Sequence, residues 1–103
     1  MIQIPVQPVP VQNLKVVLGG QNCELLIYQK NQGLFVDVSA GGEAVVNGVL
    51  ARDAVPLVFR NYIGFVGNLL FIDTQGNQDP VYTGIGSRFA LVYIDEVENA
   101  SIV

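Results

Sequence analysis

The chain has 103 residues, of which 50% are hydrophobic and 14% are charged. This length suits one domain, and the apolar content suffices for a core, which excludes a disordered protein and a multidomain enzyme. Five basic residues stand against nine acidic ones, for a net charge of −4. Because nucleic acids and anionic membrane surfaces attract clustered basic residues, we expect neither as a partner.

Residues 1–12 carry prolines at positions 5, 8 and 10 among regularly spaced aliphatic side chains. Proline fixes φ and lacks an amide donor, so this segment predicts an extended arm rather than a helix or a central strand. An apolar arm is expected to lie on a neighbouring subunit or on its own domain, with a frayed terminus as the alternative. The candidate partner-contact residues are the arm's aliphatic side chains: Ile2, Ile4, Val6, Val9 and Val11.

Residues 13–95 show apolar side chains with a period of two, interrupted by glycine-rich turns, which is typical of short strands and hairpins. Asn47-Gly48 suggests a bulge in the fourth strand. The expected strands are 14–18, 23–30, 34–38, 43–50, a short edge strand at 55–59, 69–74 and 88–95. This pattern predicts an all-β, single-domain antiparallel barrel or sandwich of six to seven strands, followed by a C-terminal tail at 96–103.

Three of these segments, 25–28, 69–72 and 89–94, are apolar on both faces. In a small antiparallel protein only one face of a strand packs on the core. We therefore expect the second face to be covered by the arm or by a partner, and we favour a partner.

Catalytic and metal-binding patterns are weak in this chain. Histidine is absent, which excludes a Ser-His-Asp triad and, with Cys23 as the single cysteine, a structural zinc site within one chain. Residues 73–79 resemble a calcium loop in spacing but lack its closing glutamate, so a polar turn is predicted, with Asp73 and Asp95 as solvated strand ends. We expect no enzyme, no metal and no cofactor.

The expected compartment follows from the same residues. Cys23 cannot form an intramolecular disulfide and is expected to be a small buried side chain. Residues 1–12 lack the pattern of a signal peptide, and no apolar run approaches the length of a spanning helix. These features predict a protein that is made in the cytoplasm and stays reduced there.

A series of short segments in a characteristic order spans residues 12 to 95. They are Leu18-Gly19-Gly20-Gln21, Leu25-x-Ile27-Tyr28, Leu34-Phe35-Val36-Asp37-Val38, Val46-Asn47-Gly48-Val49, Gly67-Asn68-Leu69-Leu70-Phe71-Ile72-Asp73, Asp79-Pro80-Val81-Tyr82 and Gly86-Ser87-Arg88-Phe89-Ala90-Leu91-Val92-Tyr93. Their order and spacing resemble the baseplate plug proteins of contractile phage tails. The resemblance implies a structural virion protein at the central hub of the tail baseplate, without catalytic residues, assembled in the cytoplasm of the bacterial host. It implies other hub, spike or tail proteins as partners and leaves a homo-oligomer open.

Two other classes stay open on the residues alone. One is a small β-barrel that binds a ligand, a peptide or a glycan, with the loop aromatics Tyr62, Phe65 and Tyr82 lining its site. The other is an enzyme that depends on carboxylates such as Asp73 or Asp79.

Overall fold

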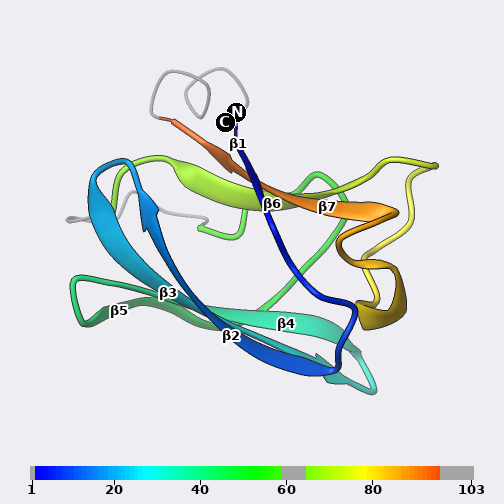
Figure 1. Cartoon of the computed structure of the whole chain (residues 1–103). Helices are drawn as coiled ribbons and strands as arrows, with labels where there is room; N and C mark the ends of the chain where they lie inside the picture. Colours follow the sequence, from blue (N-terminus) through cyan, green and yellow to red (C-terminus); the bar gives the residue numbers. More distant parts are fainter. Residues whose placement is uncertain (1, 59–64, 96–103) are drawn as a thin grey trace.

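Two antiparallel sheets face each other in a computed structural model of the chain, which describes residues 2–58 and 65–95. One sheet has the strand order β1-β7-β6 and the other has the order β2-β3-β4-β5 (Figure 1). The strands are β1 (Ile2–Ile4), β2 (Val11–Leu18), β3 (Gln21–Lys30), β4 (Gly33–Ala40), β5 (Glu43–Leu50), β6 (Asn68–Asp73) and β7 (Phe89–Ile94), with one 3-10 turn, η1 (Tyr82–Gly84). The predicted all-β fold is confirmed, as a sandwich.

The four-stranded sheet forms from consecutive hairpins. Gly19 and Gly20 join β2 to β3 with φ values of 58° and 76°, which a two-residue turn needs and which glycine adopts without steric cost. Between β4 and β5 the register shifts from Val36 opposite Val49 to Val38 opposite Val46. At this shift two residues of β5, Asn47 and Gly48, stand against one residue of β4, Asp37, so the predicted bulge is confirmed.

The main core lies between the two sheets and follows the period of two. Leu25 and Ile27 of β3 and Leu34 of β4 are fully buried, as is Leu69 of β6 on the facing sheet. Each fully buried aliphatic side chain contributes about 1.5–3 kcal/mol relative to an exposed one. The alternation therefore decides which face of each strand packs on the core.

The strands β6 and β7 bury apolar side chains on both faces, as the sequence indicates. Their second face carries a separate cluster, formed by Leu70, Ala90, Val92 and Ile94 with Ile72 packed against it. These four side chains are only 2–8% exposed within the single chain. A partner is therefore not needed to bury them.

The segment before β6 differs from the prediction. Residues 55–58 form no strand; instead, residues 53–58 run irregularly along β6, with Leu57 N–H donating to the Leu69 carbonyl at 2.8 Å. The side-chain amide of Asn68 accepts from Val58 N–H at 3.0 Å and donates to its carbonyl at 2.8 Å. Because a buried side chain replaces part of the ladder and Pro56 has no amide hydrogen, a regular strand does not form. Phe59, at the end of the predicted strand, lies outside the described residues.

A part-buried ion pair joins the end of β6 to the start of β7. Arg88 donates to both carboxylate oxygens of Asp73, from Nε at 2.9 Å and from Nη2 at 2.8 Å, and the backbone amides of Gln75 and Gln78 donate to the same carboxylate. The Asp73 side chain is completely buried, so its prediction as a solvated strand end is wrong. The hydrogen bonds from Arg88 hold the pKa of Asp73 well below its ordinary value.

This shifted pKa makes stability depend on pH. Unfolded Asp73 takes up a proton as the pH falls through about 4, whereas the folded carboxylate resists protonation, so the pair's contribution is complete above that pH and is lost below it. We expect urea unfolding of the wild-type chain to show stability falling between about pH 4 and pH 2. Asp73→Asn and Arg88→Gln should both lower stability at neutral pH and flatten this profile. An equally steep profile in Asp73→Asn would contradict the assignment.

Candidate interaction surfaces

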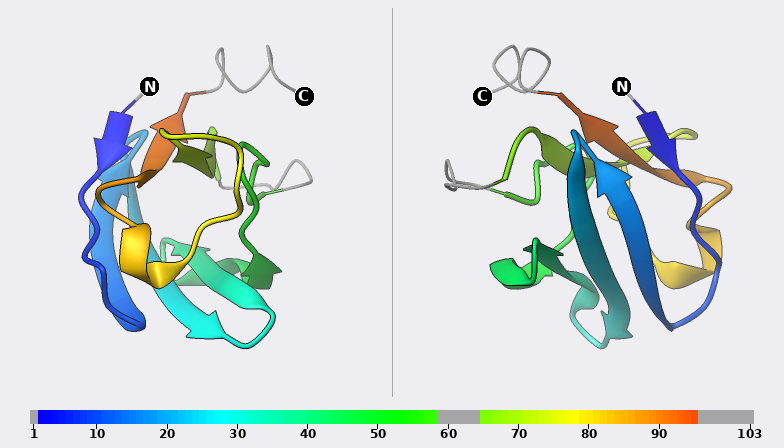
Figure 2. Two further views of the ribbon diagram at one scale, coloured as in Figure 1. Left: turned by 90° about the vertical axis from the view of Figure 1, so that its right-hand side faces the viewer. Right: turned by 60° about the vertical axis from the view of Figure 1, so that its left-hand side comes forward.

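The N-terminal arm, residues 2–10 in the structure, lies on its own sandwich. β1 pairs with β7, with Ile2 opposite Tyr93 and Ile4 opposite Leu91, and the arm then descends from the three-stranded sheet to the start of β2 (Figure 2). Of the predicted partner-contact residues, Ile4 and Val6 are buried in the main core, at 3% and 7% exposure.

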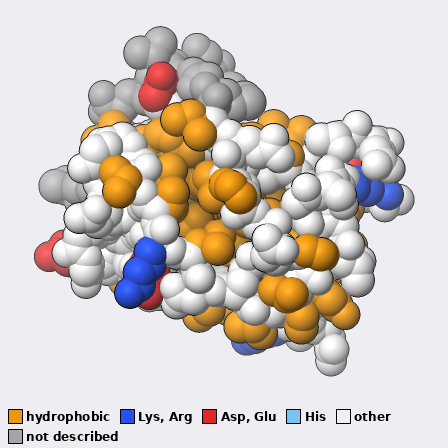
Figure 3. Space-filling view, viewed as in Figure 1, with side chains coloured by type: hydrophobic (Ala, Val, Ile, Leu, Met, Phe, Trp, Pro, Cys, Tyr) orange, Lys and Arg blue, Asp and Glu red, His pale blue; other side chains and the backbone are white. Residues whose placement is uncertain are grey.

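The other three arm candidates are accessible. Ile2 and Val11 are each 61% exposed, and Val9 is 37% exposed. On the face seen in Figure 3, hydrophobic side chains gather between β1 and β2. Contact with a partner therefore stays a prediction for Ile2, Val9 and Val11, whereas Ile4 and Val6 serve the fold of the single chain.

The reversal between the arm and β2 is held by a side chain. Val9 N–H donates to the Gln7 carbonyl at 2.9 Å, which makes a tight turn around Pro8. The Gln12 side chain accepts from Gln7 N–H at 3.0 Å and donates to its carbonyl at 2.7 Å. Gln12 thus supplies the hydrogen bonds that a neighbouring strand would otherwise provide.

The outer face of the four-stranded sheet carries a row of large side chains across all four strands. The register places Val11 opposite Tyr28, Tyr28 opposite Phe35, and Phe35 opposite Leu50. The two rings stack with centroids 5.9 Å apart, and Lys30 Nζ lies 5.4 Å and 5.5 Å from their centroids. We call these four residues the outer row: Val11, Tyr28, Phe35 and Leu50.

The outer row was not predicted from the sequence. Other strand aromatics, Phe71, Phe89 and Tyr93, are buried. Tyr28 and Phe35 are only half-buried, because their neighbours in β3 and β4 fill the inward positions. The alternation of Leu34, Val36 and Val38 against Phe35 was the signal that could have placed this ring outside.

Tyr28 is fixed by its surroundings. Its hydroxyl donates to Asp37 Oδ1 at 3.1 Å, and the amide of Gly48 donates to the same oxygen. Burial, and then the hydrogen bond to the Asp37 carboxylate, raise the pKa of Tyr28 above its ordinary value. The hydroxyl therefore stays protonated at neutral pH, and its hydrogen bond to Asp37 orients the ring at the centre of the outer row.

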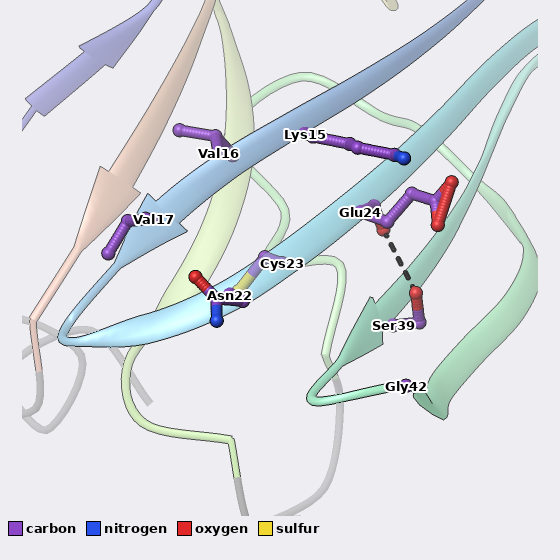
Figure 4. A pocket seen from close by; sticks show the side chains of 8 residues that line it. All are labelled: Lys15, Val16, Val17, Asn22, Cys23, Glu24, Ser39 and Gly42. Atoms are coloured by element: carbon purple, nitrogen blue, oxygen red, sulfur yellow. Dashed lines mark hydrogen bonds between the residues drawn. The ribbon is translucent and has the colours of Figure 1, made fainter.

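An open hollow of about 400 Å³ lies near the β2–β3 turn, lined by Lys15, Val16, Val17, Asn22, Cys23, Glu24, Ser39 and Gly42 (Figure 4). Ser39 Oγ donates to the backbone carbonyl of Glu24 at 3.5 Å. The Cys23 side chain is buried as predicted, and burial raises the pKa of its thiol. The hollow is wide and mixed in polarity, so it fits a surface contact better than a small ligand.

Among the described residues, those named for the alternative functions are not gathered into a site. Phe65 is buried in the main core and Tyr82 packs partly against that core, while Tyr62 lies outside the described residues. Asp73 is held by Arg88, and Asp79 Oδ1 accepts from Asp53 N–H at 3.0 Å. Within residues 2–58 and 65–95, no group of three or more His, Cys, Asp or Glu side chains is placed to hold a metal ion.

Of the part of the chain that the structure describes, no helix is both long and apolar enough to cross a membrane. The described chain is a β-sandwich with exposed aliphatic side chains on its arm and a half-buried outer row. Such surfaces are typical of a small all-β protein that makes contact with other proteins.

The particular family follows from a comparison with known families. The family model described as cyanophage baseplate Pam3 plug gp18 matches residues 1–96, and the chain belongs to this family. It is therefore a structural protein of a phage tail baseplate, and the predicted resemblance is confirmed. The match also includes the arm, which the resemblance seen in the sequence did not cover. No curated protein matches the chain significantly.

Membership has consequences for activity, partners and location. A baseplate plug family indicates a non-enzymatic role, contact with other tail or baseplate proteins, and a place in the tail of the virion. The tail contacts and the virion location agree with what the resemblance implies.

Proposed function

We propose that the chain is the plug subunit at the central hub of a contractile-tail baseplate, and that it is assembled there in the cytoplasm of the bacterial host. The observation that carries the proposal is the family match over residues 1–96, which includes both the sandwich and the arm. The partners are hub, spike or other tail proteins, and neither nucleic acid nor a membrane is among them. The charge of −4 supports this choice of partners, since an acidic subunit repels the phosphates of packaged DNA.

The contacts that would hold such a subunit come from its accessible apolar side chains. Ile2 and Val9 project from the arm, and Phe35 lies at the centre of the outer row next to Tyr28. Aromatic side chains that are rigid before binding lose little conformational entropy on docking, so they are effective anchors at interfaces. The arm and the outer row lie on separate elements, which allows contacts with two different neighbours.

The proposal is tested by assembly. Tails are purified from cells that express either the wild-type chain or variants carrying Ile2→Ser with Val9→Ser, or Phe35→Ser, and the copies per tail are measured by quantitative mass spectrometry. We expect the wild-type chain to co-purify with hub and spike proteins and to be missing from tails that lack the hub protein. The variants should incorporate at least about fivefold less well, corresponding to roughly 1 kcal/mol of lost contact energy.

The matched control is Val81→Ser, at a valine that is 40% exposed and lies outside both surfaces. It should incorporate like the wild-type chain. Circular dichroism of each purified variant checks that the fold is retained. A wild-type chain found free in the lysate and absent from intact tails would overturn the proposed role.

A further inference from the structure

The two sheets have four outer edges, and three of them are protected. β1 is only three residues long and is followed directly by Pro5. β6 is accompanied by residues 53–58, and β5 is interrupted by register shifts. Short strands, prolines, bulges and covering segments are the usual means of preventing edge-to-edge pairing.

The fourth edge, β2, is the least protected of the four among the described residues. Its eight residues contain no proline and its register with β3 is continuous, so Lys15, a charged residue of the kind that discourages edge pairing, is the one protection within the strand. Val11 and Val17, near its two ends, are 61% and 65% exposed. Such an edge is a template for another strand.

The hydrogen-bonding phase of β2 identifies which groups face outward. Gln29 N–H donates to the Pro10 carbonyl at 2.8 Å, so residues 10 and 29 form a hydrogen-bonded pair. In an antiparallel ladder such pairs alternate, which directs the backbone groups of the even-numbered residues of β2 toward β3. The odd-numbered residues therefore direct their N–H and C=O groups toward the open edge: Val11, Asn13, Lys15 and Val17.

In one antiparallel register, each of these four residues lies opposite another of the four in the second copy. If two copies of β2 pair about a two-fold axis at Leu14, Val11 lies opposite Val17 of the second copy and Asn13 lies opposite its Lys15. Pairing about Lys15 would set two lysines against each other, which is unfavourable. Pairing about Asn13 would set Val11 against a lysine. The register about Leu14 alone joins the exposed valines.

Charge is compatible with the same register. Glu24 lies opposite Lys15 on β3, so each copy brings an acidic neighbour for its own lysine to the new interface. We propose that β2 is a self-complementary edge through which two copies of this chain pair, antiparallel and centred on Leu14, to form one continuous sheet. The proposal concerns only the chain itself and does not depend on its place at the hub.

The first test is the oligomeric state of the purified full-length chain, measured by sedimentation equilibrium. We expect a dimer whose dissociation constant rises at least tenfold in the double variant Val11→Lys with Val17→Lys, because each new lysine then faces another. Val81→Lys adds one lysine at an exposed valine outside β2 and should leave the dimer unchanged. Mixing the double-lysine chain with one that carries Val11→Glu and Val17→Glu should restore pairing.

The second test reports the register. In a Cys23→Ala background, a Val11→Cys chain mixed with a Val17→Cys chain should form a disulfide-linked dimer, since directly opposite residues lie within disulfide range. Neither chain should link to itself. A purified chain that stays monomeric, a dimer that the double-lysine variant leaves intact, or self-linking by either cysteine variant would overturn the proposal. The proposal would also be overturned if the β2 amides were protected from hydrogen exchange only inside tails and this cross-link did not form. A different protein would then occupy the edge.

Discussion

We expect Ile4→Ala to lower the free energy of unfolding by about 2–5 kcal/mol, the usual cost of removing a large aliphatic side chain from a packed core. Ile4 is 3% exposed in the main core, although it lies in a three-residue strand close to the N-terminus. Its loss would leave a cavity beneath β1 and weaken the pairing of this strand with β7. Urea unfolding followed by circular dichroism measures the change.

Ile2→Ala is the matched control in the same strand. Ile2 is 61% exposed, so its truncation should change stability by no more than about 0.5 kcal/mol. A difference between the two variants locates the arm on its own sandwich in solution. Equal and small effects would contradict the structure, because they would mean that β1 is detached from β7 in the free chain.

The strands within the four-stranded sheet could be predicted from the sequence because their determinants are local. The glycines of the β2–β3 turn and the alternation of Leu34, Val36 and Val38 specify both the turns and the inward faces. Adjacent hairpins then follow without knowledge of distant parts of the chain. The predicted strands and the bulge at Asn47-Gly48 agree with the structure for this reason, except that β2 begins at Val11, inside the predicted arm.

The features that the sequence did not predict depend on residues that are far apart in the chain. Ile2 and Ile4 share a pattern, and only the pairing of β1 with β7 shows that one is exposed and the other buried. Asp73 precedes a polar turn, as solvated strand ends do, and its partner Arg88 approaches only when β6 and β7 pair. Local pattern carries no information on such long-range contacts.

The interaction surfaces fall between these two cases. The apolar character of the arm was visible in the sequence, but two of its candidate residues belong to the core. The outer row could have been found from the strand alternation that placed Leu25 and Ile27 inside, since Tyr28 must then face outward. The open edge of β2 could not be found that way. A strand is at an edge when no other strand pairs with its second side, and this is known only from the strand order of the described fold.

The second large effect is expected for Gly67→Ala, just before β6. Gly67 has a φ of 89°, and a Cβ at this position would lie against the backbone carbonyl oxygen of Ile94 and the hydroxyl of Tyr93. That hydroxyl donates to the carbonyl of Val66, so the ring cannot move away without losing a hydrogen bond. Positive φ costs a residue with a side chain about 1–2 kcal/mol, and overpacking adds about 1–3 kcal/mol.

Gly41→Ala separates the two contributions. Gly41 also has a positive φ, of 60°, but nothing lies within 4 Å of a Cβ there, so only the backbone cost should remain. In a domain of this size each kcal/mol lowers the melting temperature by about 4–8 °C. We therefore expect Gly67→Ala to have a melting temperature well below that of Gly41→Ala. The difference should correspond to the overpacking cost of about 1–3 kcal/mol. Equal melting temperatures would mean that the chain before β6 does not approach the end of β7 as closely as the structure has it.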